Sequence, residues 1–330
     1  MAQTALPRWR GFNLLDFFTT HSTGEVSEDD FRWISDWGFD FVRMPMCYTL
    51  WIEDEDVYKP HEPMLARIDR VLELGHRYGI HVSLNFHRAP GYSVNREREE
   101  PYNLWKDEEA LAAFIFHWQL FSRRYRGISS EKLSFDLVNE PSSPSEEHMT
   151  RADHERVVRA TVAAIREVDP QRPVIADGLS WGTDPCPELA DLGIGQSCRA
   201  YAPMIVSHYR ASWVNGENWP EPTWPGPDVN GELWDRERLE KHYQRWIDLA
   251  DTGVGVHCGE GGAYSHTPHD VALRWFRDVL EILSANNIGY ALWNFRGTFG
   301  VIDSDRKDVA YDKWRGHNLD RKLLDLLREH

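Results

Sequence analysis

The sequence predicts a single (β/α)₈ barrel, the TIM-barrel class of α/β fold. Short runs typical of strands alternate with longer runs of helical periodicity along all 330 residues, and such alternation implies parallel strands. The length is normal for one barrel, and no linker or low-complexity segment divides it, so we expect one domain over residues 1–330. Chemically active side chains also directly follow the strands, where a barrel places its site.

Eight strands are expected, each a short run bounded by helical or polar sequence. They are 11–15, 39–44, 80–86, 133–138, 173–177, 204–208, 253–258 and 289–293. Helices are expected over 27–37, 63–78, 108–125, 146–168, 235–250, 268–285 and 319–329, the first opening with Ser27-x-x-Asp30, a pattern typical of a capping box. An open doubly wound sheet is the alternative fold, but no Gly-x-Gly-x-x-Gly motif opens a helix.

Composition narrows the classes of partner. The net charge of -16 and the pI near 5.4 argue against nucleic acid and against polyanionic substrates, because a basic face would be expected for either. No run is long and apolar enough for a membrane span, and the first ten residues hold no apolar signal segment. We therefore expect neither a nucleic-acid nor a membrane partner, and a cytoplasmic protein unless a secretion signal has been removed.

Four cysteines are widely spaced and form no Cys-x-x-Cys pair or zinc-type cluster. Cys47, Cys186, Cys198 and Cys258 are expected to be reduced and partly buried, although pairing of Cys186 with Cys198 across a loop stays open.

Two glutamates close two different predicted strands. Glu140 follows the apolar run 133–138 within Asn139-Glu140-Pro141, and Glu260 follows the run 253–258. A single strand-end glutamate is often structural, paired with arginine or capping a helix. Two of them at the same end of a barrel are what hydrolysis of a glycosidic bond needs.

The other strand ends are also polar or aromatic. Strand two ends at Arg43, strand three at His87, the run assigned to strand six at His208 and Tyr209, and strand eight at Trp293. In this order and spacing the set resembles the clan of retaining (β/α)₈ glycosidases and, within it, glycoside hydrolase family 5, the cellulase family. The resemblance covers essentially the whole chain, from Arg10 to Trp293.

The resemblance implies a role for each matched residue. Glu140 would be the general acid/base and Glu260 the nucleophile, about 5 Å apart as in retaining enzymes. Arg43 would hold Glu260 ionised. Asn139 would bind the sugar 2-hydroxyl, His87 and His208 would line the sugar pocket, and Trp293 would form its floor.

Two departures from the family pattern stand out. The family usually has Tyr two residues after the strand-six His, whereas this chain has Arg210 there and Tyr209 one position earlier. Either Tyr209 contacts the nucleophile through a shifted backbone, or Arg210 changes the electrostatics. The family also often has Phe after the nucleophile, where this chain has Gly261.

Tryptophans are abundant, and their positions suggest two uses. Those inside predicted helices, Trp33, Trp118, Trp246 and Trp275, are expected to pack the core. The segment 211–235 holds Trp213, Trp219, Trp224 and Trp234 and is too long for a simple connection, so we interpret it as a wall beside the substrate. Trp51, Trp105 and Trp181 follow strands two, three and five, and at least one is expected to touch substrate.

A retaining, cellulase-like β-glycoside hydrolase acting on β-glucans, oligosaccharides or small β-glucosides is therefore predicted. It needs no cofactor or metal, since no His-x-His follows the first strand. The alternatives are an exo-acting β-glycosidase or a transglycosylase of other sugar specificity, and a non-catalytic carbohydrate-binding barrel. Endo or exo action, the sugar, the aglycone and the oligomeric state stay open.

Overall fold

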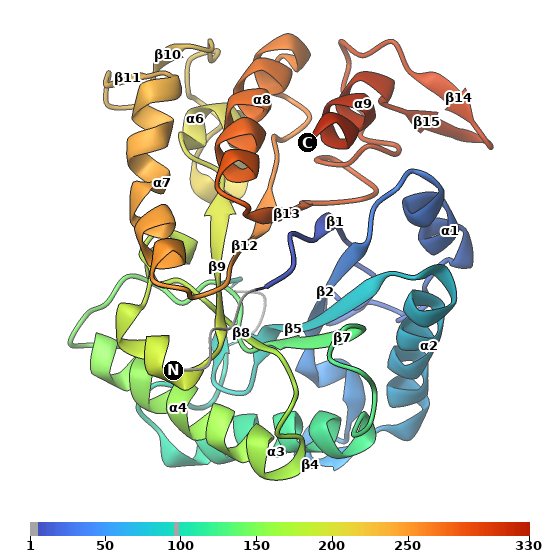
Figure 1. The fold of residues 1–330 in the computed structure, drawn as a ribbon, viewed down its shortest axis with the longest axis vertical. Coiled ribbons are helices and arrows are strands. Elements are labelled where there is room, and N and C mark those ends of the chain that lie inside the picture. Colours follow the sequence, from blue (N-terminus) through green and yellow to red (C-terminus); the bar gives the residue numbers. More distant parts are fainter. Residues whose placement is uncertain (1–5, 96–98) are drawn as a thin grey trace.

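Eight parallel strands close into a barrel in the computed structural model, which describes residues 6–95 and 99–330 (Figure 1). Their order around the barrel follows the sequence, and the pairing of β2 with β5 completes the circle. The strands are β1 (Arg10–Asn13), β2 (Phe41–Cys47), β5 (His81–Ala89), β7 (Leu133–Asp136), β8 (Val174–Asp177), β9 (Gly195–Ala200), β12 (Val256–Gly261) and β13 (Gly289–Leu292). The predicted (β/α)₈ class is confirmed.

Seven of the predicted strands are found within a few residues of their expected positions, and the sixth prediction is wrong. The run 204–208 forms the short helix α6 (Met204–Ser207), while the sixth barrel strand is β9. β9 was missed because its sequence, Gly-Gln-Ser-Cys-Arg-Ala, lacks an apolar pattern although all six residues are buried. Gln196 meets its polar needs locally, through both backbone groups of Cys186.

The outer helices occupy the predicted segments. They are α1 (Glu28–Asp36), α2 (Glu62–Tyr78), α3 (Glu108–Arg124), α4 (Arg151–Val168), α7 (Arg236–Asp251), α8 (His269–Ala285) and α9 (Arg321–Glu329). The capping box predicted at Ser27 is wrong, because the Ser27 side chain caps no backbone N–H. A capping box is instead formed at α4 by Thr150 and Asp153. Between β8 and β9 the chain makes only α5 (Leu179–Gly182) and the 3₁₀ helix η2 (Pro187–Leu192).

Shorter elements decorate the connections. After β2 come η1 (Tyr48–Trp51) and the hairpin β3 (Ile52–Glu53) with β4 (Asp56–Pro60), and β6 (Tyr92–Ser93) pairs with the end of β5. The segment 211–235 holds η3 (Ser212–Val214) and the hairpin β10 (Gly226–Pro227) with β11 (Leu233–Trp234). Near the C-terminus, β14 (Asp312–Trp314) pairs with β15 (His317–Leu319) before α9.

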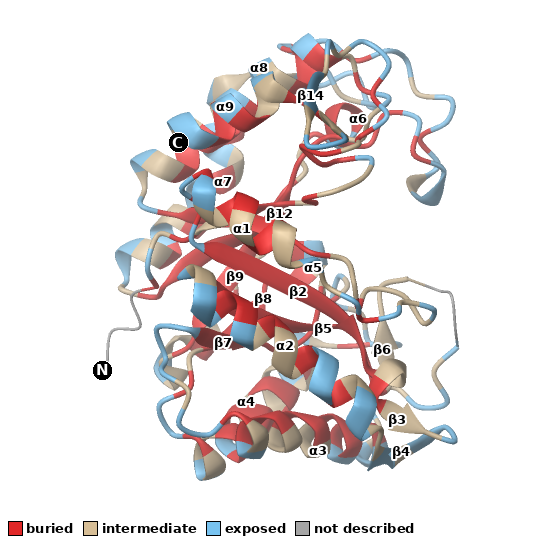
Figure 2. Ribbon diagram, turned by 90° about the vertical axis from the view of Figure 1, so that its right-hand side faces the viewer, coloured by how far each residue is buried: buried red, intermediate tan, exposed pale blue. Residues whose placement is uncertain are grey.

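Buried residues fill the barrel and the layer between barrel and helices, whereas the outer helix faces are exposed (Figure 2). The helix tryptophans at positions 33, 118, 246 and 275 are buried, as predicted. All four cysteines are free thiols and buried, so Cys186 does not pair with Cys198. Across the part of the chain that the structure describes, no helix is long and apolar enough to cross a membrane.

Candidate active site

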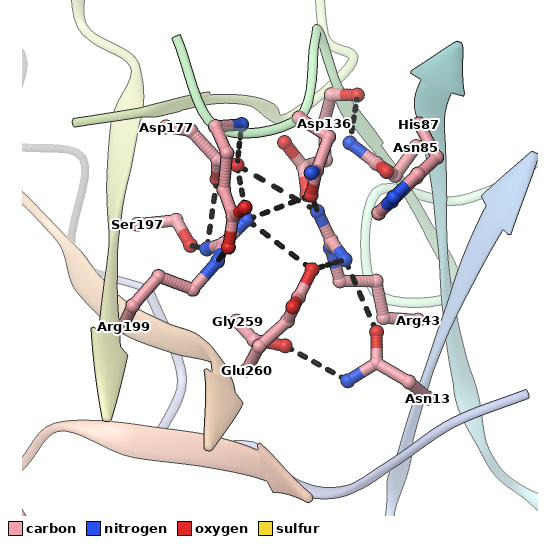
Figure 3. A network of polar contacts seen from close by, with 12 residues as sticks. Asn13, Arg43, Asn85, His87, Asp136, Asp177, Ser197, Arg199, Gly259 and Glu260 are labelled. Atoms are coloured by element: carbon pink, nitrogen blue, oxygen red, sulfur yellow. Dashed lines mark hydrogen bonds and ion pairs between the residues drawn. The ribbon is translucent and has the colours of Figure 1, made fainter. Parts of the chain in front are cut away.

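Arg43 lies at the centre of a polar cluster at the carboxyl end of the barrel (Figure 3). Its guanidinium donates to Glu260 Oε1 at 2.6 Å and to Asp136 Oδ2 at 2.6 Å. It also donates to Asn13 Oδ1 at 3.1 Å and Asn139 Oδ1 at 2.8 Å. Arg43 is 1% exposed, so its charge is held in place by these partners and faces Glu260 without screening by water.

A second buried guanidinium, that of Arg199 on β9, joins the two glutamates. Its Nε donates to Glu140 Oε1 at 3.0 Å, and its Nη2 lies 3.4 Å from Glu260 Oε1. Nη1 donates to Asp177 at 3.2 Å and Nη2 makes a second, shorter bond to the same carboxylate. Both glutamates therefore contact one guanidinium, which places their carboxyl groups close together. The predicted 5 Å separation itself stays a prediction.

The backbone of Glu140 is held in an uncommon conformation. Its φ of 49° lies in the left-handed region, which costs a non-glycine residue about 1 kcal/mol or more. Asp177 Oδ2 accepts the peptide N–H of Glu140 at 2.9 Å, and the Tyr92 hydroxyl donates to its carbonyl at 2.6 Å. These two bonds fix the Glu140 backbone at the end of its strand, so that its side chain reaches Arg199.

Glu140 has the electrostatic setting of a proton donor. Burial, and then the negative charge of Glu260, raise the pKa of Glu140 to about 8, while Arg199 opposes the rise. Asp177 adds to the rise. The Glu140 carboxyl is therefore protonated at neutral pH, whereas Glu260 receives a direct bond from Arg43.

Tyr201, directly after β9, donates to Glu260 Oε2 at 3.0 Å. The expectation that Tyr209 or Arg210 takes this position is wrong, and it failed because strand six was misplaced. Tyr209 is buried beneath the Arg210 guanidinium, 5.2 Å from its ring centre, and the described contacts join neither residue to Glu260. In the family pattern a His stands two residues before this Tyr, and here that position is Arg199.

Of the two predicted pocket histidines, His87 lies in the cluster. Its ring stacks on Trp293 at 5.7 Å, and its Nδ1 is buried without a hydrogen-bond partner in the described structure. Burial and then Arg43 lower the pKa of His87 well below its usual range, so the ring is neutral. His208 lies one layer further out, with its ring 4.9 Å from that of Tyr201 and its Nδ1 bonded to Ser207.

Two tryptophans are exposed beside the cluster. Trp181 is 50% exposed in the turn after β8. Its backbone N–H donates to Pro141 O at 3.0 Å, next to Glu140. Trp213 is 59% exposed in η3, where its ring contacts His208 at 6.0 Å. Trp51 and Trp105 are buried and pack the core. The wall predicted over 211–235 thus offers Trp213, while Trp224 is buried and bonds Asp278.

Among the described residues, no group of three or more His, Cys, Asp or Glu side chains is arranged to hold a metal ion. The cluster instead satisfies its carboxylates with two guanidiniums, Arg43 and Arg199.

A closed (β/α)₈ barrel with paired glutamates at its carboxyl end is the arrangement of a retaining O-glycosyl hydrolase. A family model described as Cellulase (glycosyl hydrolase family 5) matches residues 3–298. The chain therefore belongs to glycoside hydrolase family 5.

Relatives of known name and structure agree with this assignment. Endoglucanase C of Acetivibrio thermocellus is 26% identical over 322 residues, covering 90% of this chain and 92% of the relative. Cellodextrinase A of Ruminococcus flavefaciens is 25% identical and covers 80% and 76%. A solved glycoside hydrolase is 41% identical, with a TM-score of 0.94 over 98% of this chain and 99% of that one. Thermotoga maritima endoglucanase Cel5A, 22% identical over 97% of this chain and 96% of its own, shares the fold at a TM-score of 0.78.

Proposed function

We propose that this enzyme hydrolyses β-1,4-linked glucans and cello-oligosaccharides with retention of configuration. The observation that carries the proposal is the unequal setting of two adjacent glutamates. Glu260 is bound by Arg43 and Tyr201, both of which donate to it. Glu140 has a pKa raised to about 8. One carboxyl is thus suited to attack as an anion and the other to donate a proton.

In the first step Glu260 attacks the anomeric carbon and forms a covalent glycosyl-enzyme. Glu140 gives its proton to the leaving oxygen, which departs as an alcohol. Arg43 and Tyr201 orient Glu260 through both carboxylate oxygens. Both glutamates contact the Arg199 guanidinium, so one glycosidic bond can receive attack at its carbon and a proton at its oxygen.

In the second step water replaces the alcohol. The ester of Glu260 carries no charge, so the main charge that raises the pKa of Glu140 after burial is gone. Glu140, now an anion supported by Arg199, takes a proton from water. The water oxygen attacks the anomeric carbon, Glu260 leaves as a carboxylate, and the second inversion restores the original configuration.

Unpartnered polar atoms in the cluster fit a sugar. Asn139 Oδ1 accepts from both guanidiniums, which directs its Nδ2 elsewhere, and Nδ2 is buried without a partner among the described residues. We assign Nδ2 to the 2-hydroxyl of the sugar at the cleavage point. His87 Nδ1 is unpartnered in the same way and serves a neighbouring hydroxyl, while the Trp293 ring beneath the sugar packs on its apolar face.

The substrate class rests on two supports. The relatives named endoglucanase and cellodextrinase support β-linked glucose chains. Exposed Trp181, attached to the Glu140 segment, and Trp213, attached to the Glu260 side through Tyr201 and His208, provide ring faces on both sides of the cleavage point. A chain of several sugars is therefore favoured over a lone glycoside.

The test is hydrolysis of cellotetraose followed by proton NMR, which reports the anomer formed before mutarotation. We expect the β-anomer first from the wild type, and a loss of at least about 10³-fold in kcat/KM for both Glu140→Ala and Glu260→Ala. On 2,4-dinitrophenyl β-cellobioside, whose leaving group needs no proton, added azide should rescue Glu140→Ala as a β-glycosyl azide. Azide should rescue Glu260→Ala as the α-glycosyl azide. Early α-anomer from the wild type, or binding without turnover on every β-glucan, would overturn the proposal.

A further inference from the structure

Glu140, the proton donor of the proposed mechanism, contacts the guanidinium of Arg199, and the two groups have opposing effects on its proton. Glu140 has to hold a proton until the leaving group departs, whereas a cation beside a carboxyl favours the anion. Arg199 Nε lies 3.0 Å from Glu140 Oε1 in a site that is almost closed to water, with the Arg199 side chain 3% exposed. Some other group has to take up the Arg199 charge for Glu140 to work as an acid.

Asp177, at the end of β8, is placed to do so. Its carboxylate accepts from two nitrogens of Arg199, and its side chain is fully buried. The same carboxylate accepts the peptide N–H of Glu140 at 2.9 Å. Asp177 thus contacts both groups, Arg199 through its charge and Glu140 through its backbone.

We propose that Asp177 is a positioning residue that keeps Glu140 protonated by binding the charge of Arg199. The proposal rests on Glu140 being the general acid/base of the proposed function. While Glu260 is charged, Arg199 then lowers the pKa of Glu140 less than burial and Glu260 raise it. Once Glu260 is esterified, the nearest charges left around Glu140 are this balanced pair, and Glu140 ionises to become the base.

Among the groups around Glu140, the Asp177–Arg199 pair is the one whose charge can be changed without removing Glu260. Within residues 6–95 and 99–330, the charged or titratable groups that face Glu140 from the packed elements are Glu260 on β12, Arg199 on β9, Tyr201 after β9, Asp177 on β8 and Tyr92 on β6. Burial and then neighbouring carboxylates raise the pKa of both tyrosines above their usual range, so both stay neutral. Arg43 is bound at 2.6 Å by Asp136 and Glu260, and its Nη2 lies 3.7 Å from Asp177.

Asp177→Asn separates the bond to the Glu140 peptide from the ion pair with Arg199, although it also weakens the longer 3.7 Å contact with Arg43 Nη2. Asn Oδ1 can still accept the Glu140 N–H, while the negative charge opposite Arg199 is lost. The Arg199 charge is then shared only with Glu260 and Glu140 among its contacting carboxyls, and the pKa of Glu140 falls. We expect the alkaline limb of the kcat/KM profile, which reports the free enzyme, to move down by about one pH unit.

Leaving groups give a second readout. At pH 8 the variant should lose roughly 5-fold in kcat/KM on 4-methylumbelliferyl β-cellobioside, because a one-unit fall from a pKa of about 8 lowers the protonated fraction of Glu140 from about one half to about one tenth. On 2,4-dinitrophenyl β-cellobioside, whose leaving group needs no proton, it should lose less than about 2-fold. A variant harmed only through misplaced structure would lose activity on both substrates without a shift of the limb, and that result would overturn the proposal.

Asp177→Asn/Arg199→Met is the matched control, because it removes both charges of the pair. Its alkaline limb should return upward, to at least the wild-type position, and this variant also serves if the single one fails to fold. A limb that stays low in the double variant would contradict the inference. If the wild type cleaves neither cellobioside, the proposed function fails; if the wild type cleaves both and Asp177→Asn leaves the limb in place, only the inference about Asp177 fails.

Discussion

The two ends of the barrel interior differ, although the same strands build both. Inward side chains recur at every second residue of a strand. On β2, buried Phe41 near the amino end is followed two residues later by Arg43, and on β8 Ile175 is followed by Asp177. A layer of mainly apolar side chains at the amino end, with the buried rings of His81 and His257 packed on Phe41, thus lies directly below a layer of charges.

The amino end is closed by packing. Leu6 and Trp9 cluster with Phe41, Ile175 and Ala291, which removes this set from water. The Trp9 ring stacks on Phe41 at 5.2 Å. Such burial is the main favourable term in folding.

The carboxyl end gathers like charges. Glu140, Glu260, Asp136 and Asp177 share two guanidiniums. Buried charges gain little net stability even when paired. The lower layer thus supplies the stability that allows the upper layer to hold charges for chemistry.

Arg43→Met tests the upper layer most severely. It leaves Asp136 and Glu260 without their shortest ion pairs, and breaking a buried pair typically costs about 3–5 kcal/mol. We expect that loss in urea unfolding at pH 7, together with at least about 10³-fold lower kcat/KM. Because protonation neutralises the stranded carboxyls, stability should partly recover at pH 4.5. A stable, active Arg43→Met enzyme would show that the charged layer does not depend on its central guanidinium.

Phe41→Ala tests the lower layer. Removing this fully buried ring should cost about 3–4 kcal/mol of unfolding free energy. The kcat at 25 °C should stay within about 2-fold of the wild type, since Arg43 is fixed by its own four partners. Phe41→Leu is the matched control and should lose about 1 kcal/mol. A large loss of kcat in a folded Phe41→Ala protein would show that the layers are not separable.

Sequence reasoning reached most of the fold because seven strands carry an apolar signal. It failed at β9, whose buried Arg199 finds its partners Glu140 and Asp177 only in the folded barrel. Hydropathy cannot register a polar residue that tertiary contacts satisfy. The long gap between the strand at 174–177 and the helix at 236–251 was the available signal, since it leaves room for a strand upstream of residue 204.

The site followed the same division. The structure brings Arg43, Asn139, Glu140 and Glu260 together, and each lies in or just after a strand that carries an apolar signal. Tyr201 and Arg199 were missed with β9. Asp177 ended a predicted strand, yet no pattern marked its bond to the Glu140 peptide. That bond depends on the left-handed backbone at Glu140, which sequence does not reveal.

Glu140→Gln tests how the stability of the upper layer depends on pH. The raised pKa of Glu140 means that the folded state holds a proton that the unfolded state releases above its usual range. Stability contributed by the carboxyl is therefore lost as pH rises from about 4.5 to about 8. Glutamine does not ionise, so the variant should gain roughly 4 kcal/mol over the wild type at pH 8.5 and little at pH 4. An equal difference at both pH values would contradict the assigned pKa.

Trp181→Ala should have the smallest effect on activity and stability. It tests whether substrate binding extends from the charged layer to the exposed ring of Trp181. Ser180, Trp181 and Gly182 all have positive φ, at 53°, 56° and 78°. Two non-glycine residues in this region cost about 1 kcal/mol or more each. The turn is held against the Glu140 segment, through Trp181 N–H to Pro141 O and Ser180 N–H to Ser142 O.

A strained turn that presents a half-exposed ring beside the proton donor is expected to serve the leaving sugar. Trp181→Ala should raise KM for cellotetraose about 10-fold, the loss of one stacking contact of about 1–1.5 kcal/mol, with kcat nearly unchanged. Trp181→Phe should recover most of the affinity. Because the ring is exposed, the melting temperature should move little in either variant. Unchanged KM with a lowered melting temperature would instead show that Trp181 packs against the barrel and does not bind substrate. The site would then not extend beyond Glu140 in this direction.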